Sequence, residues 1–301
     1  MKVLRISIIV SLSFLVGFPR LAIAQEVHVG NEKFILPVVE KWIAEYKKEN
    51  PESPITIETG QNRNESTAGL CIIANKVPKT GKDKIVYLGK YALIPVSNSS
   101  SPLLIKMGKG LRKKDLTNLL FEKSIDDEDY FEGSQKEKII ATVYSRKGKV
   151  ATTITLAEAF GASIDRIKGK GIIGDDIYLV EAVQKDENGI AYNTMNYVYD
   201  INSRRLKSGL KILPLNISSK YREVIESEDM DKTIKLLEET KIDEIPVGNF
   251  GLRILEGFEK NVEVQKFVNW LINSSSVFNH QFGFMNLNDE ELAEQKRWLQ
   301  V

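Results

Sequence analysis

Short runs of β-branched and apolar residues alternate with helical patterns along the chain, and this alternation restricts the fold more than any other feature. The run Glu26–Gly30 is followed by Lys33–Glu49, in which apolar side chains recur every three or four residues and would share one helix face. Further strand patterns lie at Ile55–Glu58, Leu70–Ala74, Tyr87–Val96, Ile139–Tyr144, Ile190–Val198, Leu210–Leu213 and Gly251–Leu255, and helical patterns at Arg112–Phe121, Thr153–Phe160, Asp175–Val183 and Val264–Ile272. This order predicts an α/β fold with a largely parallel sheet.

The first 24 residues have the layout of a secretory signal peptide. Lys2 and Arg5 precede an apolar run, and Ala22-Ile23-Ala24 forms a small-x-small cleavage pattern before Gln25. The run is shorter than the roughly 20 residues of a membrane span, although an uncleaved anchor is the alternative. No cysteine stands at the cleavage point, which excludes a lipid anchor there. We therefore expect a mature chain that is soluble and periplasmic, or otherwise exported.

Chain length, net charge and cysteine content limit the kinds of protein that this chain can be. Cleavage would remove Lys2, Arg5 and Arg20 and leave 39 basic against 41 acidic residues, a balance that gives no field for binding nucleic acid. The remaining length exceeds one ordinary domain, so two lobes are expected. Cys71 is the one cysteine, so no intrachain disulfide can form and the core must supply the stability.

The sequence gives little support for a cofactor, a metal site or catalysis. Residues 169–174 spell G-x-G-x-x-G, but a helical pattern precedes them where a dinucleotide fingerprint needs a strand, so we interpret them as a flexible loop. His28 and His280 stand at opposite ends of the mature chain, and neither has local partners for a zinc site or a nucleophile–base pair. The acidic run at residues 126–129 lacks the spacing of a calcium loop. We expect no cofactor, no metal and no enzymatic activity.

Several predicted strands end in small or polar residues just before a helix. These junctions are Gly30–Phe34, the polar stretch after Thr59, Asn75, and the segment Tyr144–Thr153, which carries Arg146. In open α/β sheets, ligands bind beyond the carboxyl ends of the strands, and helix N-termini there favour anions. An arginine adds full charge and can hold an oxyanion with two parallel N–H groups. Ordinary loops with solvated lysines are the alternative.

The order of these segments resembles that of the phosphate-binding subunits of ABC importers. Gly30–Pro37 with Trp42 and Tyr46 looks like the family's opening helix, and Leu70–Asn75 resembles its second characteristic block. Arg146–Thr152 falls where the family has an arginine and a Ser-Gly-Thr loop. Other similar segments are Ser97-Asn98, Leu111–Lys123, Asn188–Tyr192, Pro246, Lys266–Leu271 and Gly283–Leu287, so the resemblance spans the mature chain.

The resemblance implies a two-lobed periplasmic binding protein of type II with two hinge crossover strands. Residues 25–97 and 246–301 would form one lobe, and residues 98–245 the other. The family holds phosphate with N–H groups at helix starts, with hydroxyls and with the arginine. Carried over to this chain, the implied ligand-binding positions are Lys33, Phe34, Gly60, Gln61, Asn75, Arg146, Val150 and Thr152.

The chain departs from the family pattern at several of these positions. Lys33 replaces a hydroxyl residue, Asn75 stands where many members have an acid or serine, and Val150-Ala151 replaces Ser-Gly. The first hypothesis is a monomeric receptor for phosphate or a related oxyanion, with the membrane permease of an ABC importer, or a sensor, as partner. The second is a binding-protein fold with a degenerate pocket that docks another protein of the cell envelope.

Overall fold

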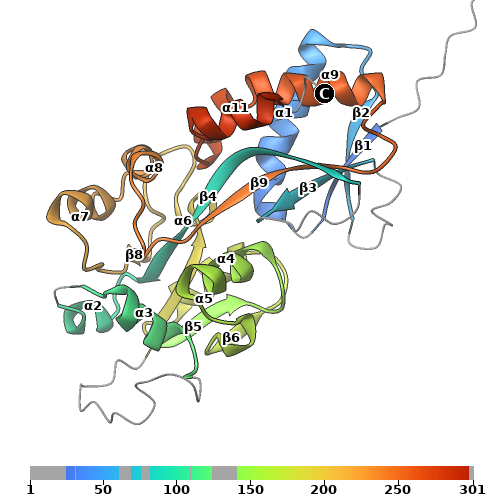
Figure 1. Ribbon diagram of the computed structural model, residues 1–301. Coiled ribbons are helices and arrows are strands. Elements are labelled where there is room, and N and C mark those ends of the chain that lie inside the picture. Colours follow the sequence, from blue (N-terminus) through green and yellow to red (C-terminus); the bar gives the residue numbers. More distant parts are fainter. Residues whose placement is uncertain are drawn as a thin grey trace, which may run out of the picture.

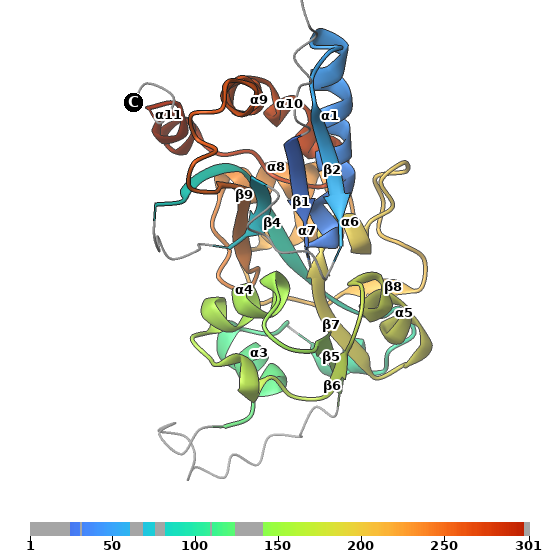
Figure 2. The ribbon, with the colours of Figure 1, turned by 90° about the vertical axis from the view of Figure 1, so that its right-hand side faces the viewer.

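The computed structural model describes residues 25–30, 32–60, 69–75, 82–108, 110–123 and 141–297. The predicted signal peptide at residues 1–24, Gln61 and the acidic run at 126–129 lie outside the described residues, so what was expected of them stays a prediction. Two lobes lie side by side and are joined by long strands (Figure 1 and Figure 2). No helix in the described part of the chain is long and apolar enough to cross a bilayer.

The described residues form nine strands, in the order β2-β1-β3-β9-β4-β7-β5-β6 with β8 paired to β4. They are β1 (Gln25–Val29), β2 (Ile55–Thr59), β3 (Leu70–Ala74), β4 (Lys84–Asn98), β5 (Thr142–Arg146), β6 (Lys170–Ile172), β7 (Gly189–Thr194), β8 (Leu210–Ile212) and β9 (Val247–Ile254). Strand β1 pairs in parallel with β2 and β3, and β5 pairs in parallel with β6 and β7. Pairs that include β4 or β9 are antiparallel. The α/β class is confirmed, but the expected parallel pairing holds only inside the lobes.

Strands β4 and β9 connect the lobes and form the hinge (Figure 1). Between Lys84 and Ala92, β4 pairs with β9, and from Leu93 onward it pairs with β7 of the second lobe. Strand β9 begins at Val247, directly after Pro246. The two crossover strands of the predicted architecture are therefore present, while the lobe limits at residues 97 and 246 stay a prediction.

Helices pack against the strands of both lobes, and α4 and α6 lie where the lobes meet. The helices are α1 (Leu36–Glu49), α2 (Leu103–Lys106), α3 (Lys113–Leu120), α4 (Ala151–Phe160), α5 (Ile177–Lys185), α6 (Met195–Val198), α7 (Ser219–Glu226), α8 (Met230–Glu239), α9 (Val262–Ser274), α10 (Ser276–Asn279) and α11 (Asp289–Arg297), with 3-10 turns at Lys33–Ile35, Ile164–Arg166 and His280–Phe282. Trp42 of α1 stacks on Phe250 of β9, with ring centroids 6.0 Å apart, and Tyr46 meets Phe267 of α9 edge-on at 5.0 Å. Both ends of the mature chain thus share one aromatic core.

The predicted strand Ile190–Val198 is wrong in its second half. Strand β7 stops at Thr194, where the Asn193 side chain accepts a hydrogen bond from the Thr194 backbone N–H at 2.7 Å. Helix α6 follows, and it buries Met195 and Val198 on one face because they are three residues apart. An apolar run of this length fits a strand and a buried helical turn equally well, so periodicity could not separate them.

The G-x-G-x-x-G segment is ordered as strand β6 rather than as the flexible loop expected. Gly169 enters this strand with φ +86°, and a Cβ at that position would lie 2.1 Å from the Val143 carbonyl oxygen of β5. Only glycine fits this backbone conformation and this close approach without strain. The glycine therefore serves strand packing.

We expect Gly169→Ala to lower the free energy of unfolding by roughly 2–4 kcal/mol, because it combines a disfavoured positive φ with a backbone clash. The matched control is Gly257→Ala, which has φ +91° but no atom within 4 Å of the added Cβ. Urea denaturation of both variants measures the difference. Equal losses would show that β5 and β6 do not pack as closely as described.

Candidate functional site

The carboxyl ends of the parallel strands bring most of the predicted junctions together. In the first lobe, β1 pairs in register with β2 and β3, so Gly30, Gly60 and Asn75 follow three neighbouring strands at one sheet edge. In the second lobe, Arg146 ends β5 and lies directly before the segment that leads into α4. Asn75 touches α4, so the two edges meet across the cleft between the lobes.

Asn75 forms a direct bridge between the lobes. Its Nδ2 donates to the Ala151 carbonyl oxygen at 2.9 Å, and its Oδ1 accepts hydrogen bonds from the hydroxyls of Tyr91, at 2.5 Å, and Thr155. The Tyr91 and Thr155 hydroxyls are themselves 2.7 Å apart. Asn75 is 6% exposed and has φ +76°, a left-handed conformation that asparagine tolerates better than most residues. The amide thus holds the first lobe to α4.

The hinge is built around this bridge. Tyr91 lies on β4 with its ring 4.9 Å from that of Phe34, and it is fully buried. Gly248 on β9 leaves room for it, because a Cβ there would lie 2.5 Å from the Tyr91 hydroxyl oxygen. A second link crosses the cleft where Asn196 Nδ2 donates to the Phe34 carbonyl oxygen at 2.7 Å. The lobes are therefore in contact through side chains of both.

Arg146 lies inside the protein and is paired with an acid of its own lobe. Its Nη1 donates to Asp176 Oδ2 at 2.9 Å, and the Thr152 hydroxyl donates to Asp176 Oδ1 at 3.3 Å. The Arg146 side chain is 10% exposed and that of Asp176 is 3% exposed. Asn193 of β7 fixes the backbone of this acid by donating to its carbonyl oxygen at 2.7 Å. The acid thus holds the two side chains, Arg146 and Thr152, that the family resemblance implies for an oxyanion.

Part of this cleft has unused hydrogen-bonding capacity. Arg146 Nε, Thr194 Oγ1 and Asn196 Oδ1 are buried and make no hydrogen bond within the described residues. A buried polar group without a partner costs about 1–3 kcal/mol, so such groups are usually bound to something. The Nε edge of a guanidinium is one that can hold a carboxylate or phosphate with two parallel N–H groups. Asp176 takes Nη1, and Nε stays buried without a hydrogen-bond partner in the described part of the chain.

The other predicted positions lie at varied distances from this centre. Lys33 is exposed, Phe34 is 1% exposed, and Gly60 is half-buried beside Glu58. The Val150 N–H donates to the Gly148 carbonyl oxygen at 3.2 Å and to the Thr153 hydroxyl at 3.1 Å, so it is already engaged. The structure brings together Phe34, Asn75, Arg146 and Thr152 around the start of α4, and Gln61 lies outside the described residues. Their roles in ligand binding stay predictions.

Four residues of this centre were not expected: Tyr91, Thr155, Asp176 and Asn196. Asp176 stands directly before α5, and the sequence pattern did place a helix start near it. Asp176 could not be predicted as a partner of Arg146 because strand β6 was not predicted. Pairing of β6 with β5 places Ile172 opposite Arg146, and this brings the loop after Ile172 next to Arg146. Tyr91 lies within β4 and Thr155 within α4, and the sequence pattern of a strand or helix does not show which of its polar side chains contact another lobe.

The histidines are used in local contacts. His28 Nδ1 pairs with Glu58, and His280 Nε2 lies 2.7 Å from Glu238 Oε1, which raises the pKa of His280. Among the residues that the structure describes, no three His, Cys, Asp or Glu side chains form a group that could hold a metal ion.

Asp176 should make stability depend on pH. Burial raises the pKa of its carboxyl from an ordinary value near 3.8 to about 6, although the Arg146 charge opposes the shift. Because the folded chain binds this proton more tightly, the contribution to stability is complete below about pH 4 and is lost as the pH rises through 6. Relative to Asp176→Asn, we expect the wild-type chain to lose about 2 kcal/mol between pH 4 and pH 7. Urea denaturation across this range measures it, and a difference independent of pH would contradict the assignment.

Solved structures of other proteins match this fold, although their sequences have little similarity to this chain. No family model and no curated protein sequence matches this chain. A putative phosphate ABC transporter substrate-binding protein from Clostridium perfringens with bound phosphate matches with a TM-score of 0.58 and 13% identity, over 88% of this chain and 100% of that chain. An ABC-type phosphate transport receptor from Vibrio cholerae matches with a TM-score of 0.57 and 9% identity, over 87% and 100%. The fold is that of a two-lobed periplasmic binding protein.

The same fold also occurs in regulatory domains. The CcmR regulatory domain of Synechocystis PCC6803 in complex with 2-PG matches with a TM-score of 0.50 and 13% identity, over 84% of this chain and 97% of that chain. These neighbours are ligand-binding proteins. Identities this low show the shared fold and leave the ligand open.

Proposed function

We propose that this chain is an exported solute-binding protein that holds a small anion, phosphate or a related oxyanion, between its lobes. The observation that carries the proposal is the buried guanidinium of Arg146, whose Nε has no partner in the described chain. It lies at the carboxyl end of β5, in the class of position where α/β proteins bind ligands. The putative phosphate ABC transporter substrate-binding protein from Clostridium perfringens and the phosphate transport receptor from Vibrio cholerae have the same fold.

The binding mode follows from the groups around Arg146. An oxyanion would take the Nε edge of the guanidinium while Asp176 keeps Nη1. The first turn of α4 adds its partial positive charge, and Thr152 adds a hydroxyl. Asp176 weakens binding by its negative charge when it is ionised. Binding is therefore stronger when Asp176 is protonated, below about pH 6.

The proposal includes transport. The amino-terminal pattern of residues 1–24 supports export, and residues 25–97 with 246–301 would form one lobe around the hinge, with 98–245 as the other. The protein would act as a monomer that delivers its anion to the membrane permease of an ABC importer, or to a sensor. Its role is binding rather than catalysis.

Calorimetric titration of the mature chain with phosphate, sulfate, molybdate and phosphonates tests the proposal. We expect micromolar or tighter binding of at least one oxyanion. Sulfate separates the pH effect from ligand ionisation, because it stays a dianion, and it should bind more tightly at pH 5.5 than at pH 7.5. Asp176→Asn should bind sulfate tightly at both values. No heat with any of the four anions at either pH would overturn the proposal.

A second function is favoured by the internal contacts of the cleft. Asp176 accepts a hydrogen bond from Arg146 Nη1, and Asn75 already forms hydrogen bonds between the lobes. Some of the groups that would bind a ligand are therefore already hydrogen-bonded within the protein. A degenerate binding fold that docks another envelope protein would have such a cleft. Absence of anion binding combined with a folded, closed protein would support this alternative.

A further inference from the structure

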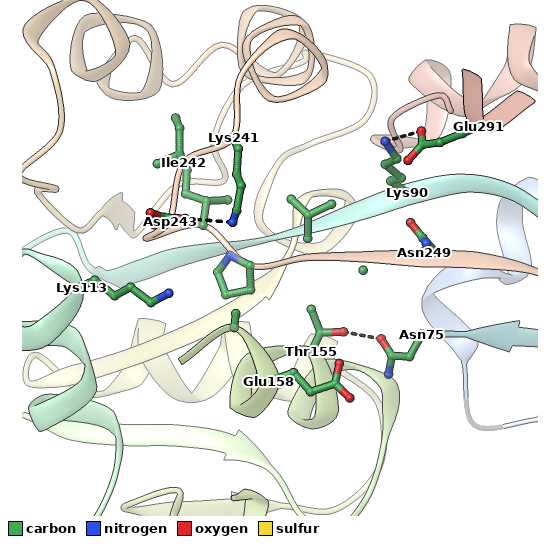
Figure 3. A pocket seen from close by; sticks show the side chains of 15 residues that line it. Asn75, Lys90, Lys113, Thr155, Glu158, Lys241, Ile242, Asp243, Asn249 and Glu291 are labelled. Atoms are coloured by element: carbon green, nitrogen blue, oxygen red, sulfur yellow. Dashed lines mark hydrogen bonds and ion pairs between the residues drawn. The ribbon is translucent and has the colours of Figure 1, made fainter. Parts of the chain in front are cut away.

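A second pocket lies over the hinge; Asn75 and Thr155 of the centre described above also line this pocket. It encloses about 540 Å³, within the range of small-molecule sites, and the backbone of β9 forms its floor (Figure 3). One wall comes from the first lobe with Asn75, Lys90 and Glu291, and the opposite wall comes from α3, α4 and residues 241–245 of the second lobe. Neither Arg146 nor Asp176 lines it. We call it the hinge pocket.

The charges of the hinge pocket balance. Three lysines and three acids line it. Four of these side chains are paired at the rim, because Lys90 Nζ lies 2.6 Å from Glu291 Oε2 and Lys241 Nζ lies 3.3 Å from Asp243 Oδ1. A pocket of zero net charge gives no advantage to a simple anion or a simple cation.

Lys113 and Glu158 are the charges that stay unpaired. Neither makes an ion pair with another residue in the described ranges. Lys113 extends from the start of α3 with its ammonium 5.9 Å from the centre of the Phe160 ring, and Glu158 projects from α4. In Figure 3 the two side chains enter the pocket from different directions, Lys113 from the side of α3 and Glu158 from below Thr155. The pocket thus offers one cation and one anion at separate places.

Between these charges the lining is apolar or can form hydrogen bonds. Ile242, Ile245, Pro246 and Val247 provide the apolar surface, and the Asn249 side chain on β9 points into the cavity (Figure 3). An occupant that fits must carry a negative group, a positive group and an apolar part between or beside them. The volume suits a short peptide.

We propose that the hinge pocket binds a small zwitterion, a short unblocked peptide whose two terminal charges are separated by its backbone. Its carboxylate pairs with Lys113, its ammonium group pairs with Glu158, and its side chains lie on the apolar wall. Because both lobes line the pocket, the bound molecule favours the closed arrangement of the lobes. Its charged groups differ from those of the oxyanion site at Arg146.

Calorimetry of the mature chain with a panel of unblocked dipeptides and tripeptides tests the proposal. We expect at least one of them to bind, and Lys113→Gln and Glu158→Gln each to weaken its binding about five- to tenfold. Blocked ligands assign the two charges: the amide form, which lacks the carboxylate, should not respond to Lys113→Gln, and the N-acetyl form should not respond to Glu158→Gln. Both positions are at least partly exposed, so the variants should fold.

Two controls separate this site from the oxyanion site. The double variant Arg146→Ala with Asp176→Asn, which leaves no buried carboxylate without a partner, should leave zwitterion binding unchanged, whereas Lys113→Gln should leave sulfate binding unchanged. Lys220→Gln, an exposed charge removal on α7, should affect neither. The proposal is wrong if no zwitterion binds, or if binding occurs and neither Lys113→Gln nor Glu158→Gln weakens it.

Discussion

Arg146→Ala is expected to weaken oxyanion binding by at least about 100-fold. The guanidinium supplies two charge-assisted hydrogen bonds from a side chain that is 10% exposed, and each such bond contributes about 1.5–3 kcal/mol. Calorimetry with sulfate is best done at pH 5.5, where Asp176 is largely protonated, because the wild-type affinity is then highest and the largest loss of affinity can be measured. An unchanged affinity would remove Arg146 from the site.

Lys147→Ala is the matched control because it removes a neighbouring positive charge that is exposed. It should change sulfate affinity by less than about threefold at moderate salt, since exposed charges are screened. Arg146→Ala also leaves Asp176 buried without its partner, which destabilises the fold at neutral pH. The double variant Arg146→Ala with Asp176→Asn restores neutrality, so a loss of binding in this variant reports the lost guanidinium rather than unfolding.

The second large effect is expected at Asn75. Asn75→Gly removes the hydrogen bonds to Ala151 and Thr155 that cross between the lobes, while glycine keeps the backbone at φ +76° without strain. At about 1 kcal/mol for each bond, the equilibrium between closed and open lobes should shift roughly 30-fold toward the open form. The ligand-free wild-type chain should be mainly closed.

Spin labels on Glu52→Cys and Asp165→Cys, both exposed and on different lobes, measure the opening by the distance between them. Cys71 is buried and should not take the label. Asn75→Ala should open the lobes to the same extent but lose more stability, because alanine is strained at positive φ. A distance distribution that is the same in the wild-type chain and in Asn75→Gly would show that the amide does not hold the lobes together.

The α/β class could be predicted from the sequence because the helical and strand patterns of apolar residues are strong in the amphipathic elements. In α1 and the 3-10 turn before it, the four-residue spacing of Phe34, Val38, Trp42 and Tyr46 predicted the buried face, and all four side chains are buried. The strand-end rule placed Asn75, which follows β3, and Arg146, which ends β5, near the contact between the lobes, while their roles in ligand binding stay predictions. These features depend on local pattern alone.

Features that depend on pairing between distant segments could not be predicted. The three residues of β6 carry two exposed positions and no alternation, so only their pairing with β5 makes them a strand. Asp176 becomes the partner of Arg146 through that pairing. The Asn75 bridge likewise needs the lobes to be placed relative to one another, because Ala151 is 76 residues away in the chain.

Crystals of the mature chain grown with selenate test the central claim most directly, because selenium gives an anomalous signal at the anion itself. We predict one strong peak within hydrogen-bonding distance of Arg146 Nε, about 3 Å away, beside the first turn of α4. Peaks confined to surface lysines, with Arg146 bound to Asp176 alone, would contradict the account.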